Sequence, residues 1–284
     1  MELNKVYCGD SRRMDSIDND SVHLTVTSPP YFVGKDYENY LKSIDDYFDM
    51  IRGVFKETVR VTIPGGKIII NLGDLAVGSH FNEGGFPEEY LIMLELWRYL
   101  RTLDTYLHGR IIWEKDDPWA NSSHVTFHDK IKHGSYRILP AWEYVFVFRK
   151  GKKDREDKIA EDGRWITKDE WKTWVHGVWF IRSVQRNDFH EAMFPDELVY
   201  RCVKMYSFPG DVVLDPFMGS GTVAVVAKIM GRNFVGYERI SEYVTMAQSK
   251  ADAITPEMIQ KQTRYFDKTE NKNELQGDIF NVPV

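Results

Sequence analysis

The sequence predicts an α/β protein in which helices cover both faces of a doubly wound, mostly parallel sheet of seven strands. Short apolar runs typical of strands alternate along the chain with segments whose apolar residues recur at helical spacing. Such alternation favours parallel strands joined by helical crossovers. In addition, unusual loops at 27–31 and 215–222 each follow an apolar run. Because ligands of open α/β sheets bind beyond the carboxyl ends of the strands, we expect both loops to border one cleft.

The predicted strands are short and mostly apolar. The run 67–72 follows the turn Pro64-Gly65-Gly66 and contains the continuous apolar stretch Ile68-Ile69-Ile70, which indicates burial on both faces. Two other runs are expected to pair as a hairpin at one end of the sheet, 109–113 with 144–148. The full set comprises 5–8, 21–28, 67–72, 109–113, 144–148, 211–215 and 234–237.

The predicted helices carry recognisable start signals. Ser43 is expected to cap one helix, with Asp46 three residues later as its capping-box partner. Regular patterns are lost at about 114–139 and again at 151–175, where polar, histidine-rich and charged residues dominate. Further helices are expected at 87–100, 195–206, 222–230 and from Ser241 onwards.

Composition excludes several classes of protein. The chain is 43% hydrophobic and 28% charged, and its apolar runs are too short for a membrane helix. Its start lacks the features of a signal peptide, so we expect a cytoplasmic protein with no membrane partner. Cys8 and Cys202 cannot form a disulfide framework or a zinc site, and both are predicted to be buried. No metal is expected.

Basic residues are concentrated in the middle third of the chain, although the net charge of −6 argues against a generic nucleic-acid binder. Acidic residues at 154, 156 and 157 interrupt the cluster, so a solvated loop and a phosphate-facing surface both stay open. The cluster comprises Lys130, Lys132, His133, Arg137, Arg149, Lys150, Lys152, Lys153, Arg155 and Lys158.

The loop at 215–222 has the context of a nucleoside-cofactor loop. A predicted strand precedes it, a predicted helix follows it, and Gly219 and Gly221 would let a ligand approach the backbone closely. Glu238 ends the next strand 23 positions after Asp215, near the offset of about 20 residues expected for a ribose-binding carboxylate. No Gly-Lys-[Ser/Thr] follows, which argues against a nucleoside-triphosphate loop. A tight turn beside an unrelated glutamate is the alternative.

The loop Thr27-Ser28-Pro29-Pro30-Tyr31 has a chemical interpretation. Its two prolines lack N–H donors and fix φ, which makes the backbone stiff and rich in acceptors. The Ser28 side chain and the Pro29 carbonyl could accept hydrogen bonds from an exocyclic amino group and so direct its lone pair towards an electrophile. The Tyr31 ring could stack on an extruded base. A plain strand-terminating turn is the alternative.

Together these motifs resemble the S-adenosylmethionine-dependent DNA amino-methyltransferases of the permuted β group, as found in restriction–modification systems. In that group the catalytic loop comes first, the recognition region follows, and the cofactor loop comes last. The resemblance covers nearly the whole chain and implies a permuted, Rossmann-like methyltransferase fold with S-adenosyl-L-methionine as cofactor. Family members commonly have His-Pro-Ala ahead of the Phe-Pro pair, whereas Glu191 stands between His190 and Ala192 here.

The resemblance also implies roles for particular residues. Asp10 would contact the cofactor adenine, Phe194-Pro195 would pack beside its methionine moiety, and Glu238 would bind its ribose. Base flipping would present the target to Ser28, Pro29, Pro30 and Tyr31 as catalytic residues. The cofactor loop would comprise Asp215, Pro216, Phe217, Gly219, Ser220, Gly221 and Thr222, and the candidate DNA contacts are Lys130, Lys132, Arg137, Lys152 and Lys153.

Four regions follow from this assignment. Residues 1–113 would form the catalytic half of the methyltransferase domain, and residues 189–253 its cofactor-binding half. The smaller inserted region 114–188 would recognise the target while contributing one core strand near 143–150. Residues 254–284 would form a C-terminal tail that is loosely packed or used in oligomerisation.

The implied activity is site-specific methylation of the exocyclic N4 of cytosine in duplex DNA by direct attack. Missing Pro-Cys argues against C5-cytosine methylation, which relies on a thiolate. In the resembling family a leading serine usually accompanies N4-cytosine and a leading aspartate or asparagine N6-adenine, so N6-adenine methylation remains an alternative. An RNA or protein-glutamine N-methyltransferase and a non-enzymatic nucleic-acid-binding module also stay open. A homodimer and a cognate restriction endonuclease are further partners that the resemblance allows.

Overall fold

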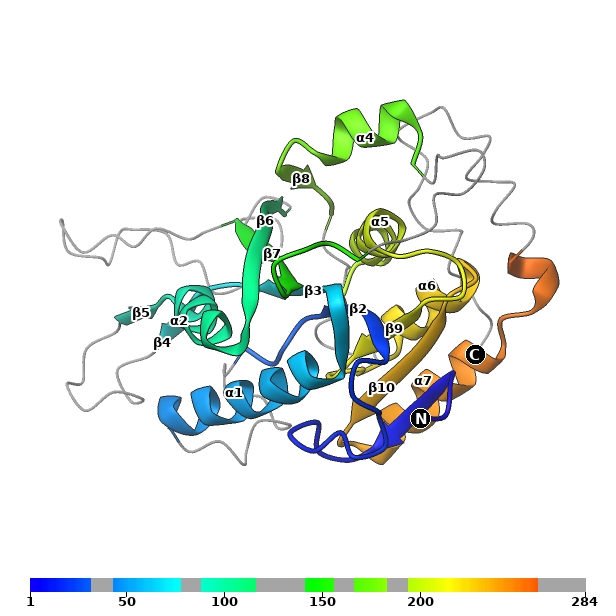
Figure 1. Cartoon of the computed structure of the whole chain (residues 1–284), viewed down its shortest axis with the longest axis horizontal. Helices are drawn as coiled ribbons and strands as arrows, with labels where there is room; N and C mark the ends of the chain where they lie inside the picture. Colours follow the sequence, from blue (N-terminus) through cyan, green and yellow to red (C-terminus); the bar gives the residue numbers. More distant parts are fainter. Residues whose placement is uncertain (32–42, 78–87, 116–140, 156–165, 183–193, 260–284) are drawn as a thin grey trace, which may run out of the picture.

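The computed structural model describes residues 1–31, 43–77, 88–115, 141–155, 166–182 and 194–259. Within these residues, an eight-stranded sheet runs through the molecule in the order β1-β10-β9-β2-β3-β7-β6-β8 (Figure 1). Its strands are β1 (Lys5–Cys8), β2 (Val22–Thr27), β3 (Thr62–Leu72), β6 (Thr105–Glu114), β7 (Trp142–Lys150), β8 (Val178–Phe180), β9 (Val212–Asp215) and β10 (Asn233–Glu238).

The sheet is mostly parallel, as predicted. Only β7 runs against its neighbours, β3 and β6, whereas the other five strand pairs are parallel. The predicted hairpin is confirmed as β6 and β7, but it does not end the sheet, because β8 pairs with the outer side of β6. With three residues, β8 is too short to produce a readable pattern of its own.

A separate two-stranded sheet corrects one predicted boundary. Strand β4 (Leu75–Val77) pairs with β5 (Glu88–Tyr90), which occupies the first residues of the predicted helix 87–100. The helix α2 therefore begins only at Ile92 and ends at Leu100, where the short 3-10 helix η2 (Arg101–Leu103) continues the chain.

Helices cover both faces of the sheet because its central strands are apolar on both sides. In β3, Ile68 and Ile70 pack in the cluster that includes α1 and α2, whereas Ile69 packs in the cluster that includes α5, α6 and α7. The Ser43 side chain caps α1 by accepting a hydrogen bond from the Asp46 N–H. The remaining helices are α1 (Ile44–Val61), α4 (Lys168–Trp174), α5 (Asp196–Tyr206), α6 (Thr222–Ile229) and α7 (Ser241–Asp252).

Strand direction defines two edges of the sheet. The parallel strands β1, β2, β3, β9 and β10 all end at one edge, here called the carboxyl edge, and begin at the other, the amino edge. Because β7 is antiparallel to β3, it begins at the carboxyl edge and ends at the amino edge. Both candidate loops follow parallel strands and therefore lie at the carboxyl edge, as predicted.

Two local findings qualify the sequence predictions. The prediction that both cysteines are buried is wrong for Cys8, which is exposed near the end of the first edge strand, and right for Cys202 inside α5. The first residues of the predicted tail are packed rather than loose, since Ile254 clusters with Val225 and Ile229 of α6. Throughout the described residues, helices fall short of the length and apolar character that crossing a membrane requires.

Candidate active site

The predicted catalytic loop, residues 27–31, leaves β2 at the carboxyl edge and is fixed by contacts at both of its ends; it is called the catalytic loop below. Thr27, the last residue of β2, donates a hydrogen bond from Oγ1 to Asp215 Oδ1 at 2.7 Å. Tyr47 of α1 donates from its hydroxyl to the Pro30 carbonyl at 2.9 Å. Pro29 is buried, whereas Ser28, Pro30 and Tyr31 are half-buried. The structure therefore places the loop directly beside the first residue of the cofactor loop.

Tyr31 ends the catalytic loop in a hydrogen-bonded cluster. Its hydroxyl donates to Glu143 Oε2 at 2.7 Å and lies 3.4 Å from Ser28 Oγ. Burial raises the pKa of Tyr31 well above its usual value, and the neighbouring Glu143 carboxylate raises it further. The phenol therefore remains protonated at neutral pH.

Glu143 was not named by the sequence motifs, although it is central to this cluster. It lies near the start of β7 with only 8% of its surface exposed. Asn71, near the end of β3, donates from Nδ2 both to Glu143 Oε2 at 2.9 Å and to the Tyr144 carbonyl at 3.1 Å. Lys115, which follows β6, forms an ion pair with Glu143. Three strands distant in sequence thus converge behind Tyr31, and no local pattern marks them.

The cofactor loop is shaped mainly by its own backbone. Gly219 and Gly221 have φ values of 50° and 91°, which L-residues with side chains rarely adopt. A Cβ on Gly221 would also lie 2.8 Å from Ala247 Cα in α7. Glycine is therefore required for both conformation and space where the loop enters α6. Ser220 is buried, and Thr222 begins the helix.

Glu238 ends β10 beside this loop, in the position predicted for the ribose-binding acid. Its Oε2 accepts a hydrogen bond from the Gly219 N–H at 2.9 Å. Its Oε1 accepts from the N–H groups of Arg239 at 2.7 Å and Ile240 at 2.9 Å. A carboxylate has about four lone-pair positions, two on each oxygen, so Oε1 is filled and Oε2 can still accept one hydroxyl from a ligand.

Asp10 lies near Glu238 because β1 pairs with β10. Cys8 is in register with Glu238, and the Gly9 N–H donates to the Glu238 carbonyl at 2.9 Å. Burial raises the pKa of Asp10, but hydrogen bonds and the charge of Arg12 outweigh it, so the net shift is downward. The first strand of the predicted catalytic half therefore lies within the cofactor-binding half.

Asp215 links the two loops. Its Oδ1 accepts hydrogen bonds from Thr27 Oγ1 and from the Phe217 N–H at 2.9 Å. Burial raises its pKa to about 7, the two hydrogen bonds lower it in part, and the charge of Glu238 raises it. Pro216 is buried after it, and Phe217 packs against the same apolar cluster as Tyr31.

Phe194 and Pro195 lie at the start of α5. Pro195 caps the helix by accepting hydrogen bonds from the Leu198 and Val199 N–H groups. Phe194 packs against the cluster of α5, α6 and α7, on the sheet face opposite to the one that Phe217 contacts. His190, Glu191 and Ala192 lie outside the described residues.

The predicted DNA contacts are separated by the structure. Lys130, Lys132 and Arg137 lie outside the described residues, whereas Lys152 and Lys153 are exposed just after β7, at the amino edge. Three basic residues of the same cluster form ion pairs with carboxylates within the fold: Arg149 with Asp154, Lys150 with Asp20, and Arg155 with Asp211. Their part in a phosphate-facing surface stays a prediction. The role of the five candidate contacts stays a prediction.

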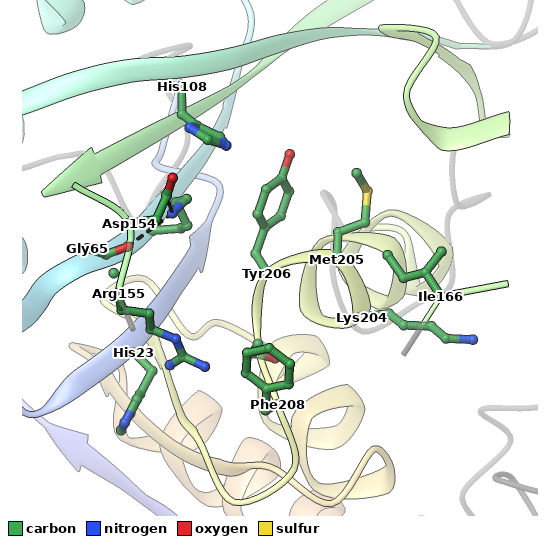
Figure 2. Close-up of a pocket in the computed structure, with 13 residues that line it drawn as sticks. His23, Gly65, His108, Asp154, Arg155, Ile166, Lys204, Met205, Tyr206 and Phe208 are labelled. Carbon is green, nitrogen blue, oxygen red and sulfur yellow. Dashed lines mark hydrogen bonds and ion pairs between the residues drawn. The ribbon is translucent and has the colours of Figure 1, made fainter. Parts of the chain in front are cut away.

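A cavity of about 450 Å³ also lies at the amino edge, away from the catalytic loop. Figure 2 shows Tyr206 rising from the end of α5 into this space beside His108 of β6; their rings meet edge to face at 6.3 Å. The side chains around it that carry charge already form ion pairs, including Lys67 with Asp154 at 2.6 Å. None of the catalytic or cofactor candidates lines this cavity.

Comparison with known protein families agrees with the position of both loops. A family model described as DNA methylase matches residues 22–249, a span that contains both loops. The chain belongs to this N6/N4 DNA methylase family. The match confirms the predicted DNA amino-methyltransferase.

Individual relatives agree with the family. The type II methyltransferase M.BglI of Bacillus subtilis is 27% identical over 89% of this chain and 86% of its own length. The type II methyltransferase M.MjaI of Methanocaldococcus jannaschii is 30% identical over 83% of this chain and 86% of its own length.

Solved structures confirm the Rossmann-like fold. A Thermus thermophilus protein described as a DNA modification methylase, complexed with S-adenosyl-L-methionine, matches with a TM-score of 0.70 and 29% identity, over 89% of this chain and 94% of that one. The PvuII DNA methyltransferase, described as cytosine-N4-specific, matches with a TM-score of 0.65 over 98% and 92% of the two chains. At 21% identity, the second likeness shows the fold alone.

Proposed function

We propose that this methyltransferase transfers a methyl group from S-adenosyl-L-methionine to the exocyclic N4 of cytosine at specific sites in duplex DNA in the cytoplasm. One observation carries the proposal: the serine-led loop and the glycine loop meet at one sheet edge through the Thr27–Asp215 hydrogen bond of 2.7 Å. Acceptors for an amino group thus lie next to a loop shaped for a cofactor.

The residues at this edge fit the proposed cofactor. Glu238 Oε2 would accept a hydrogen bond from a ribose hydroxyl, and Asp10, just after the neighbouring strand β1, would contact the adenine. The glycine loop lies beside the same acid, because the Gly219 N–H donates to Glu238 Oε2 at 2.9 Å. Phe194 and Pro195 would pack beside the methionine moiety. When bound, S-adenosyl-L-methionine supplies an electrophilic methyl group.

The protein contributes binding and orientation. Tyr31 would stack on the flipped base, while Ser28 Oγ and the Pro29 carbonyl accept hydrogen bonds from its amino group. The amino nitrogen then uses its lone pair to form the new N–C bond, the C–S electron pair remains on sulfur, and one amino proton is lost to water. Because no covalent bond to the enzyme forms, alignment supplies most of the rate enhancement.

N6-adenine is the second candidate, because the matching family includes both N6 and N4 methyltransferases. The leading Ser28 favours cytosine, but both reactions need the same acceptors beside an amino group. Within the proposal, region 114–188 recognises the DNA site with the help of Lys130, Lys132 and Arg137. A homodimer and a cognate restriction endonuclease are proposed partners of this activity.

The direct test is methyl transfer from labelled S-adenosyl-L-methionine to unmethylated genomic DNA, followed by mass spectrometry of the nucleosides. We expect N4-methylcytosine. N6-methyladenine would keep the mechanism and change the target base. Absence of any methylated nucleoside, with the cofactor still bound, would contradict the proposal and direct the search to RNA or protein glutamine.

The Tyr31→Ala variant tests whether the loop is catalytic. We expect about 100-fold less product, since stacking of one base on an aromatic ring contributes about 1–3 kcal/mol. Tyr106→Ala is the control, because Tyr106 is an exposed tyrosine on β6. Unchanged transfer in the Tyr31 variant would favour a non-enzymatic binding module or a different catalytic loop.

A further inference from the structure

We propose that Glu143 is a positioning residue that sets the direction of a hydrogen-bond chain from Ser28 through Tyr31 to Glu143. This direction makes Ser28 present a lone pair, rather than its proton, to the amino group of the target base. The inference rests on the proposed function, because it concerns how the same loop recognises an amino group.

The first link is the short contact between Tyr31 and Glu143. The Tyr31 hydroxyl lies 2.7 Å from Glu143 Oε2, the usual distance of a hydrogen bond to a carboxylate. An ionised carboxylate can only accept hydrogen bonds, and a phenol has a single proton to donate. The Tyr31 proton therefore points to Glu143.

Other donors keep Glu143 in its acceptor role. Asn71 Nδ2 donates to Glu143 Oε2 at 2.9 Å, and Lys115 forms an ion pair with the other oxygen. Since the Asn71 amide also donates to the Tyr144 carbonyl at 3.1 Å, its nitrogen is identified as the donor. All of these partners are donors, so Glu143 accepts a hydrogen bond or ion-pair contact from each of them.

The second link follows from the first. Because the Tyr31 hydroxyl directs its proton to Glu143, its oxygen can only accept from Ser28, whose Oγ lies 3.4 Å away. This distance is long for a hydroxyl pair, and catalytic hydrogen bonds commonly shorten when substrate binds. Once the Ser28 proton points to Tyr31, both lone pairs of Oγ are left for the amino hydrogens of the target.

Close packing makes the arrangement rigid. A Cβ on Gly73 would lie 3.3 Å from Glu143 Cγ and 3.6 Å from Tyr31 Cε1, so backbone passes close to both side chains. The Tyr47 hydroxyl donates to the Pro30 carbonyl and so fixes the turn between Ser28 and Tyr31. The hydrogen-bond chain explains why the Ser28 hydroxyl, which can donate or accept, acts only as an acceptor towards the target base.

A double-mutant cycle separates this role from a structural one. We expect Glu143→Gln to lower the single-turnover rate of methyl transfer about tenfold, the effect of about one hydrogen bond to a charged group. Cofactor affinity should not change. In a Tyr31→Phe background the same substitution should change the rate less than about twofold, because the connecting hydroxyl is absent. Equal losses in both backgrounds would overturn the proposal.

Two variants sharpen the cycle. Glu57→Gln removes another carboxylate that is paired with a basic residue, Arg60, near the end of α1 and away from the catalytic loop, and it should leave the rate unchanged. In a Ser28→Asp background, Glu143→Gln should again have little effect, since aspartate accepts without being oriented by Tyr31. A full tenfold loss in that background would contradict the chain.

A spectroscopic measurement decides the contact without requiring activity. In protein labelled with ¹³Cζ-tyrosine, the resonance that disappears in Tyr31→Phe belongs to Tyr31. We expect this resonance to shift both in Glu143→Gln and in Ser28→Ala. If the resonance fails to shift in one or both of these variants, the proposed hydrogen-bond chain is overturned. If the wild-type protein methylates no DNA while both shifts occur, the proposed function fails and the hydrogen-bond chain stands.

Discussion

The catalytic loop and the cofactor loop meet at the carboxyl edge, yet their shapes have different origins. The cofactor loop depends on backbone: two glycines at positive φ and the Gly219 N–H, which donates to the adjacent Glu238. The catalytic loop depends on side chains from other elements, with Glu143 binding Tyr31 and Tyr47 binding Pro30. The residues of a loop predict its backbone shape, but they do not predict which side chains of distant strands contact it. A substitution that disturbs one loop should therefore leave the other loop intact, so that cofactor binding and methyl transfer can be measured separately.

The largest effect is expected at Asp215, which contacts both loops. Its folded-state pKa of about 7 lies above the value of about 3.9 in an unfolded chain, so the folded state binds more protons between these values. The free energy of unfolding should therefore fall as pH rises from about 4 to about 7, by on the order of 4 kcal/mol relative to Asp215→Asn. Urea denaturation across this pH range measures the difference.

Asn can still accept from Thr27, so the variant keeps the local hydrogen bond while it removes the titration. Asp49→Asn is the control, since the side chain of Asp49 is 78% exposed. A difference between wild type and Asp215→Asn that does not vary with pH would contradict the assignment.

A smaller effect is expected when the backbone of the cofactor loop is crowded. Gly221→Ala would place a Cβ 2.8 Å from Ala247 Cα, and overpacking of this kind costs about 1–3 kcal/mol in addition to the strain of positive φ. Gly210→Ala is a matched control, with a similar φ of 86° and no atom within 4 Å of the added Cβ. We expect thermal denaturation to show a clearly larger loss for Gly221→Ala, together with weaker cofactor binding. Equal losses would mean that the contact with α7 is not restrictive.

Glu238→Gln should weaken cofactor binding by about tenfold while leaving the catalytic loop intact. The amide has one acceptor oxygen in place of two, so it must turn an NH₂ group towards backbone N–H donors on one side. About 1.4 kcal/mol, the loss of roughly one charged hydrogen bond, corresponds to this factor. Isothermal titration with S-adenosyl-L-methionine measures it, and Glu242→Gln at the exposed start of α7 is the control. Unchanged affinity would remove Glu238 from the cofactor site.

The smallest effect is expected far from both loops. The double variant Lys152→Ala/Lys153→Ala should leave the salt dependence of DNA binding unchanged, because these residues follow β7 at the amino edge. The corresponding variant Lys130→Ala/Lys132→Ala should reduce the slope of log K against log salt by about two, the value for two lost phosphate contacts. A reduced slope in the first variant would support Lys152 and Lys153 as DNA contacts.

The order of the core elements and the positions of both loops could be predicted from the amino-acid sequence. Alternation of apolar runs predicted the parallel strands, because burial on both faces requires continuous apolar residues, as Ile68 to Ile70 show. The motifs at 28–31 and 219–221 could be recognised in the sequence for a similar reason. Proline and glycine have local backbone effects that do not depend on the rest of the chain. The hairpin of β6 and β7 was predicted, but the addition of the three-residue β8 was not.

The tertiary structure alone decided which side chains complete the site. Glu143 and Asn71 lie 72 positions apart, yet they meet at the carboxyl edge because β7 runs antiparallel to β3. Strand direction likewise put Lys152 and Lys153 at the opposite edge, and the pairing of β1 with β10 brought Asp10 to Glu238. Contacts of this kind depend on register and direction between distant strands, which the residues of either strand alone do not specify.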